Sequence, residues 1–125
     1  NNEKLIIDYK SGAVAVSKMM GNPIEQAQLP IYAISNTVDG VAFAAINPSD
    51  CQFKAITKNK SALPLKPQAK SKMPEWDIQL KEWYSALNSA SDDFQNGIAK
   101  VLPTKNACEF CGYDLLCRVE KSPNH

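Results

Sequence analysis

Asp8 and Lys10 are the first residues in the sequence whose types and spacing could support catalysis. They follow an apolar run at residues 5–7, which predicts a short buried strand, and they precede a Ser-Gly turn. Because side chains alternate along a strand with a period of two, both should lie on one face of a sheet, with Tyr9 on the other. A carboxylate that can hold a divalent metal ion, beside a lysine that can orient a water molecule, is half of a phosphodiester-cleaving site. The alternative is a simple ion pair at a strand end.

The composition predicts one folded domain with little overall charge. Of the 125 residues, 44% are hydrophobic, which is enough to bury a modest core. Lys and Arg number 14 and Asp and Glu number 13, so the net charge of +1 argues neither for nor against nucleic acid, and any DNA contact has to be local. No apolar run approaches the length of a membrane span and no leader opens the chain, so we expect a soluble cytoplasmic protein.

The chain opens Asn-Asn-Glu without a Met, and its first predicted strand begins at Lys4. A buried strand needs neighbouring strands that so short a prefix cannot supply. We therefore expect the chain to be the C-terminal part of one larger domain, and a sheet edge left open could pair with a second copy. Its expected parts are a strand-helix-hairpin core over 4–58, a basic loop over 59–74, a long helix over 75–97 and a cysteine-bearing tail over 98–125.

The sequence after the Ser-Gly turn predicts a connector and then a helix over residues 22–36. Asn22 would be the N-cap, Pro23 the first helical residue and Glu25 the capping-box partner. Gln28 and Tyr32 lie four residues apart and would share one helix face. They are either a partly exposed amide and a rim tyrosine, or a pair that contacts a phosphate or base beside Asp8 and Lys10. The expected core stripe of this helix is Ile24, Ala27, Ile31 and Ile34, and Pro30 should kink the helix or end its regular first part.

Two further strands, a loop and a long helix follow. Residues 41–47 predict a buried strand and 51–58 an edge strand, which together form an antiparallel hairpin. Residues 59–74 are rich in lysine and proline and predict a flexible surface loop, which could follow a phosphate backbone or be merely solvated. Residues 75–97 predict the longest helix, with Trp76 and Trp83 as core anchors and Gly97 as its C-terminal cap.

Cys108, Cys111 and Cys117 form the pattern C-x2-C-x5-C near the C-terminus. Three cysteines are an odd number for disulfides, which an intracellular protein also disfavours. Thiolates at this spacing suit zinc or an iron–sulfur cluster, each of which normally takes four ligands. Cys51 could be the fourth ligand, yet no second cysteine accompanies it, so it is more consistent with a structural residue.

Three motifs together resemble the C-terminal half of RecB-like nucleases of the PD-(D/E)XK superfamily, and most closely the AddB-type exonucleases. They are Ile-Ile-Asp-Tyr-Lys-Ser-Gly over 6–12, Q-x3-Y over 28–32, and the three cysteines followed by Arg118. The resemblance covers roughly residues 4–36 and 103–118. It implies an α/β fold of the restriction-endonuclease type, a mixed sheet flanked by helices, that cleaves DNA with Mg²⁺ or Mn²⁺.

The resemblance also assigns roles to individual residues. Asp8 would bind the metal, Lys10 would position or activate the attacking water, and Gln28 and Tyr32 would line the site and contact DNA. The three cysteines, Cys108, Cys111 and Cys117, would be ligands of a 4Fe-4S cluster, with zinc as the alternative. In the family, the fourth cysteine and the second acidic residue come from an upstream part, which we expect to be missing here.

The implied function is DNA cleavage in repair or recombination, with a helicase domain or subunit as a potential partner and with the isolated chain incomplete as a catalyst. The rival hypothesis is a non-catalytic module, stapled by zinc or a cluster, that binds DNA or a partner protein. A zinc-ribbon-like structural protein is the weaker rival, because a second C-x2-C is absent.

Overall fold

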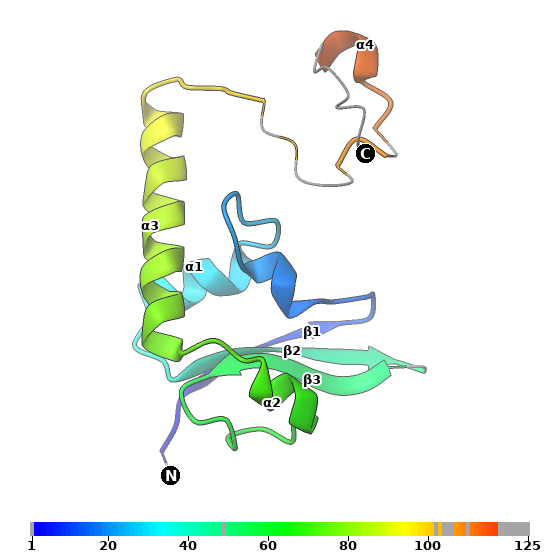
Figure 1. Ribbon diagram of the computed structural model, residues 1–125, viewed down its shortest axis with the longest axis vertical. Helices are drawn as coiled ribbons and strands as arrows, with labels where there is room; N and C mark the ends of the chain where they lie inside the picture. The colour runs from blue at the N-terminus through cyan, green and yellow to red at the C-terminus, as the bar shows by residue number, and fades with distance from the viewer. Residues whose placement is uncertain (1, 49, 102, 104–106, 110, 118–125) are drawn as a thin grey trace.

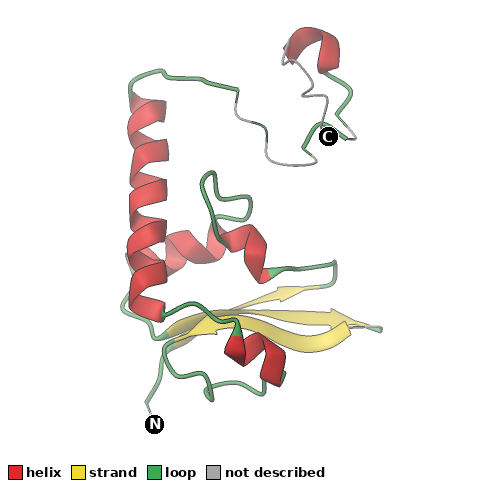
Figure 2. Cartoon of the chain, viewed as in Figure 1, coloured by secondary structure: helices red, strands yellow, loops and turns green. Residues whose placement is uncertain are grey.

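The protein is built on a mixed three-stranded sheet. The computed structural model describes residues 2–48, 50–101, 103, 107–109 and 111–117. Strand β1 (Leu5–Lys10) pairs in parallel with β2 (Gly40–Asn47), which pairs antiparallel with β3 (Asp50–Thr57), so the sheet order is β1-β2-β3. Figures 1 and 2 show the helices on both sides of this sheet. The predicted α/β fold and the predicted hairpin are therefore confirmed.

Strand β1 lies at an edge of the described sheet and is half-buried over most of its length, not fully buried as its apolar run predicts. Its parallel connection to β2 runs through helix α1 (Gln28–Ser35), as parallel neighbours require a crossover. The hairpin strand β2 is the buried centre of the sheet, since its first six residues are all buried. Period-two alternation then puts the side chains of β1 on two different faces.

One face of the sheet is covered by α1, by the short 3₁₀ helix η1 (Val16–Met19) and by the base of α3 (Trp76–Gln95). Trp83 of α3 is 1% exposed and its indole Nε1 donates a hydrogen bond of 2.6 Å to the carbonyl oxygen of Met19. Trp76 packs edge-on against Trp83, with ring centroids 5.9 Å apart. The two tryptophans are thus core anchors, as predicted, and they join α3 to the connector after β1.

Helix α1 begins at Gln28 with Ala27 as its N-cap, five residues later than the capping-box pattern predicts, so the predicted start at Asn22 is wrong. A helix from Asn22 would place Pro30 in its interior, where its ring and missing N–H disrupt the hydrogen-bond ladder. In the observed helix Pro30 is the third residue. The N–H groups of the first four helical residues have no intrahelical partner, so a proline there removes no helical hydrogen bond. The first helical bond, from Ile31 N to Ala27 O, follows directly at 2.9 Å.

The later start also changes the buried face of α1. The buried residues are Leu29, Pro30 and Ala33, whereas Ile31 of the predicted stripe is 44% exposed. Ile24 precedes the helix and, like Ile34, is only partly buried against the core. The face of α1 that packs on the sheet therefore does not include Gln28 or Tyr32.

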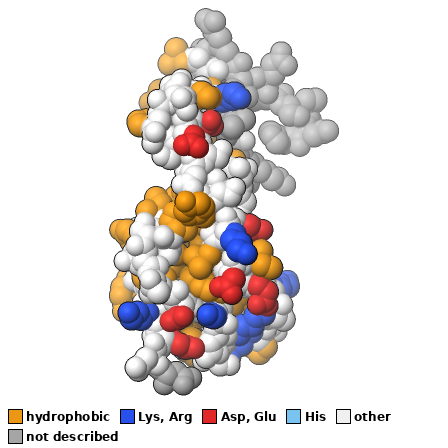
Figure 3. All heavy atoms as spheres, turned by 90° about the vertical axis from the view of Figure 1, so that its left-hand side faces the viewer, with side chains coloured by type: hydrophobic (Ala, Val, Ile, Leu, Met, Phe, Trp, Pro, Cys, Tyr) orange, Lys and Arg blue, Asp and Glu red, His pale blue; other side chains and the backbone are white. Residues whose placement is uncertain are grey.

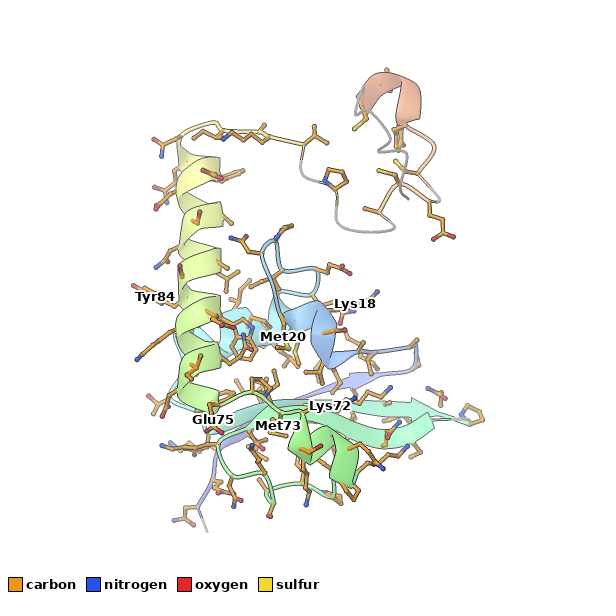
Figure 4. The ribbon with its side chains drawn as sticks, viewed as in Figure 1. Lys18, Met20, Lys72, Met73, Glu75 and Tyr84 are labelled. Carbon is orange, nitrogen blue, oxygen red and sulfur yellow. The ribbon has the colours of Figure 1, made fainter. Side chains whose placement is uncertain are left out.

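The opposite face of the sheet is covered by the segment that the sequence predicts to be a flexible loop. It contains helix α2 (Pro67–Ser71), and both Leu65 and Met73 are 7% exposed. The sulfur of Met73 lies 3.4 Å from the backbone nitrogen of Thr57 at the end of β3. Figure 4 shows Met73 beneath the sheet and Lys72 beside it. The segment is a packed cover for the sheet, although none of its lysines is buried.

The two ends of helix α3 have different surroundings. Its first half carries the tryptophans, whereas residues 88–95 are all exposed and Phe94 is 86% exposed. Gly97, with a φ of 67°, follows the helix in the left-handed conformation that its predicted capping role requires. Beyond it, helix α4 (Asp114–Cys117) is one short turn. In the described part of the chain no helix is long and apolar enough to cross a membrane.

Replacing Gly40 with alanine should destabilise the fold by about 1–3 kcal/mol, the usual cost of overpacking. A Cβ at this position would lie 2.6 Å from Thr57 Cγ2, 2.8 Å from Leu5 Cδ2 and 3.0 Å from the Thr57 backbone. Urea unfolding measures the change, with Gly12→Ala as the control, because nothing lies within 4 Å of a Cβ there. Equal stability of the two variants would contradict the close approach of the three strands at Gly40.

Candidate active site

Asp8 and Lys10 form an ion pair on one face of β1. Lys10 Nζ lies 3.0 Å from Asp8 Oδ2, and their side chains are 38% and 18% exposed, respectively. The shared face was predicted from the period of the strand and is confirmed, while Tyr9 points the other way and is 68% exposed. The ion pair is thus half open to solvent, in reach of a substrate.

The carboxylate of Asp8 is paired at one oxygen. Its Oδ2 is buried, and its close polar neighbour is the Lys10 ammonium at 3.0 Å. A partly exposed carboxylate is a suitable ligand for a hard divalent cation. Asp8 therefore fits one ligand position of a Mg²⁺ or Mn²⁺ site. Among the described residues, however, no group of three or more His, Cys, Asp or Glu side chains could hold a metal.

Gln28 and Tyr32 stand one turn apart on the exposed face of α1. Gln28 is the first residue of the helix, and the Tyr32 side chain is 44% exposed. The helix packs against β1 and β2, which brings it to the same side of the sheet as Asp8. In the described part of the chain no hydrogen bond or ion pair joins Gln28 or Tyr32 to Asp8 or Lys10. Gln28 and Tyr32 thus lie on the same side of the sheet as Asp8 and Lys10, but they form no polar contact with them.

Two polar residues of β3 share this face, and the sequence reasoning did not single them out. In the strand register Asp8 lies beside Phe43, which lies opposite Lys54. Lys10 lies beside Ala45, which lies opposite Gln52. Residues directly paired across strands point to the same face. The alternation of residues 51–58 already indicates this arrangement, because Gln52 and Lys54 are polar and lie two residues apart in a strand.

The cysteines are free thiols in the structure. Cys108 is partly exposed, and Cys111 and Cys117 are exposed. The backbone nitrogen of Cys111 donates to the carbonyl oxygen of Cys108 at 3.4 Å, so these two are joined by a turn, and Cys117 ends α4. Cys51 is exposed at the start of β3. Arg118, the last residue of the proposed motif, lies outside the described residues, and within the described ones no metal-binding group of cysteines forms.

Charge is spread evenly over the face of the molecule that α3 presents. Figure 3 shows acidic and basic side chains interspersed there around a hydrophobic patch. Ion pairs such as Lys18 with Glu25 at 3.9 Å and Lys60 with Glu75 at 3.6 Å neutralise several lysines locally. The electrostatics of this face provide no broad basic surface for a DNA backbone. Any DNA contact on this face has to be local.

Comparison with known proteins agrees with the motifs. The family model of the PD-(D/E)XK nuclease superfamily matches residues 1–118. No curated protein matches the chain. No solved structure matches it either. The match covers β1, the helix with Gln28 and Tyr32, the hairpin and the segment with the three cysteines. The chain belongs to the PD-(D/E)XK nuclease superfamily.

Proposed function

We propose that the protein is a metal-dependent DNA nuclease with Asp8 and Lys10 at its centre. The superfamily typically hydrolyses phosphodiesters with a divalent metal. The observation that carries the proposal is the pairing of Asp8 Oδ2 with the Lys10 ammonium, 3.0 Å apart on a partly exposed face of β1. A carboxylate that binds a metal and a lysine that orients a water are the two groups that such hydrolysis requires from adjacent positions.

Each candidate residue has a distinct task. A metal at Asp8 would polarise the scissile phosphate and ease ionisation of a bound water. Lys10 holds the same carboxylate oxygen that a metal would take, so it is placed at the rim of the site, where it orients the attacking water. Gln28 and Tyr32, both exposed on α1, are available as donors to a phosphate oxygen or a base.

One carboxylate is too few for tight binding of Mg²⁺, which is usually held through several oxygen ligands. The described residues supply no further acidic side chain near Asp8 that would make a metal-binding group. We propose that the additional carboxylate comes from outside these residues, for example from a strand that pairs with the edge of the sheet at β1. The chain by itself would then be a poor catalyst, and self-association through that edge would be a side effect of its exposure.

Within the superfamily we assign the protein to the RecB-like group, close to AddB-type exonucleases, acting in repair or recombination with a helicase domain or subunit. The support is C-x2-C-x5-C over residues 108–117, which suits three ligands of a 4Fe-4S cluster or a zinc ion. Iron content and the visible spectrum of protein purified without oxygen distinguish the cluster from zinc.

The direct test is cleavage of linear DNA in Mg²⁺ or Mn²⁺ by the full-length protein and by Asp8→Asn. The variant removes the charge but keeps the shape of the side chain, so we expect cleavage to fall by about 10²-fold or more, as when a metal ligand is lost. Asp93→Asn is the matched control, because Asp93 is exposed near the far end of α3. Wild-type activity of Asp8→Asn would remove Asp8 from the site.

A second candidate function follows from the single carboxylate. A protein that keeps the nuclease fold but cannot assemble a metal site would bind DNA or a partner without cleaving it. DNA binding by the full-length protein, with no cleavage in either Mg²⁺ or Mn²⁺, would favour this module over the nuclease.

A further inference from the structure

Lys54 reaches from β3 to the segment that leaves the candidate site. Its ammonium Nζ donates a hydrogen bond of 3.0 Å to the carbonyl oxygen of Val14, in a partly buried position, across 40 residues of sequence. Lys54 also shares a row of the sheet with Asp8, because both are in register with Phe43. The lysine therefore lies on the face that bears the ion pair, two strands from it.

Residues 11–20, here called the connector, run from the end of β1 through η1. The connector is hydrogen-bonded both to the sheet and to α3: Lys54 donates to the Val14 carbonyl, and Trp83 donates to the Met19 carbonyl. The backbone nitrogen of Gln26 also donates to the Lys18 carbonyl at 2.8 Å, which joins η1 to the segment before α1. The two anchors thus divide the connector into a part beside the site and a part beside the core.

The Lys54 anchor is the one beside the site. Val14 is buried and lies four residues after Lys10, whereas residues 11–13 are all exposed. Lys10 is the last residue of β1 and is paired with Ala45, so fixing Val14 four residues later restricts the path by which the chain leaves the strand beside the Lys10 side chain. Figure 1 shows the connector turning back over the sheet directly after β1.

We propose that Lys54 is a positioning residue of this nuclease: by holding the Val14 carbonyl it fixes the connector and thereby the placement of Lys10 beside Asp8. The inference rests on the proposed function of Asp8 and Lys10. It assigns Lys54 no contact with the substrate. Its effect is on geometry, and errors of about 1 Å in the placement of reacting groups can reduce rates by about 10²-fold.

The test compares Lys54→Met and Lys54→Arg with Lys58→Met, whose lysine is exposed just beyond β3. Hydrogen exchange of the amides of residues 11–16 and the side-chain NMR signals of Asp8 and Lys10 report the positioning without any need for activity. We expect Lys54→Met to speed exchange in 11–16 and shift both signals. We expect Lys54→Arg, which keeps a donor, to restore them, and Lys58→Met to change nothing.

Kinetics supply the second readout. We expect Lys54→Met to lower kcat on linear DNA by about 10- to 100-fold with little change in KM. Trp83→Phe, which removes the donor at the core end of the connector but keeps an aromatic ring there, should leave kcat near the wild-type value. Unchanged exchange in Lys54→Met, or loosened exchange with wild-type kcat, would overturn the proposal. If the wild type does not cut DNA, the nuclease proposal fails, while exchange and NMR still decide whether Lys54 holds the pair.

Discussion

Replacing Lys10 with alanine should lower the rate of DNA cleavage in Mg²⁺ by about 10²- to 10⁴-fold, the range that a positioned proton-transfer or water-orienting group contributes. The ammonium lies 3.0 Å from the carboxylate oxygen proposed to bind metal, and its side chain is 38% exposed, so it is accessible to substrate. Single-turnover cleavage of linear DNA by the full-length protein measures the change.

Stability separates a chemical role for Lys10 from a structural one. Lys10→Ala leaves the buried Oδ2 of Asp8 without its counter-ion, so it should lose about 1–3 kcal/mol of folding free energy and remain folded in the absence of urea. Lys58→Ala removes an exposed lysine near the same sheet and should keep full activity. A folded Lys10→Ala variant that cleaves at the wild-type rate would show that Asp8 and Lys10 form only a structural ion pair at the end of a strand.

If Asp8 binds the metal ion, the metal and Lys10 would compete for the same atom. Oδ2 of Asp8 is buried and lies 3.0 Å from the ammonium. The Lys10 side chain is 38% exposed, so a metal at Oδ2 would displace the ammonium toward solvent. One pair could then serve both as a resting contact and as the proposed metal and water positions.

The strand that carries the site was predictable because its information is local. The alternation of β1 depends only on the period of extended backbone, and the apolar run and Ser-Gly turn define its ends. The hairpin likewise follows from two short runs around a turn. The residues that β3 adds to the same face, Gln52 and Lys54, needed the register across three strands, which no single stretch of sequence contains.

The start of α1 was not predictable from its capping pattern. Asn22, Pro23 and Glu25 satisfy every local preference for a helix start, but continuing from there would place Pro30 in a helix interior. The observed start at Gln28 places this proline in the first turn. Two local signals eight residues apart conflict, namely the capping pattern that starts at Asn22 and the proline at position 30. A proline in the helix interior is the more costly violation, so the helix starts later. Gln28 and Tyr32 stay on one face in either case.

Burial of the lysine-rich segment was missed for a different reason. Its lysines and prolines indicate solvent exposure, and none of the lysines is buried, but Leu65 and Met73 are buried against the sheet. Thr57 is 1% exposed, and its backbone nitrogen lies 3.4 Å from the sulfur of Met73. No hydrophobic periodicity in 59–74 predicts that contact. The assignment of the three C-terminal cysteines as cluster ligands remains a proposal. Their spacing suits certain metals, but spacing alone does not show that the three sulfurs surround one metal site.

Replacing Trp83 with alanine should cost about 3–5 kcal/mol of folding free energy, a large share of the roughly 5–15 kcal/mol that stabilises a typical domain. The indole is 1% exposed, packs edge-on against Trp76, and donates its N–H to the carbonyl oxygen of Met19, which is itself fully buried. The substitution leaves a cavity and an unpaired carbonyl together. Trp83→Phe should cost less, about 1–3 kcal/mol, mainly for the lost hydrogen bond.

Tyr84 provides the matched control on the next residue of the same helix. Its side chain is 60% exposed, and Figure 4 shows it directed away from the core. Tyr84→Ala should therefore change the free energy of unfolding by about 0.5 kcal/mol or less, as surface substitutions do. Urea unfolding followed by circular dichroism compares the three variants. Similar losses for Trp83→Ala and Tyr84→Ala would mean that α3 is not anchored to the connector through Trp83, and the second anchor of the connector would then have to be sought elsewhere.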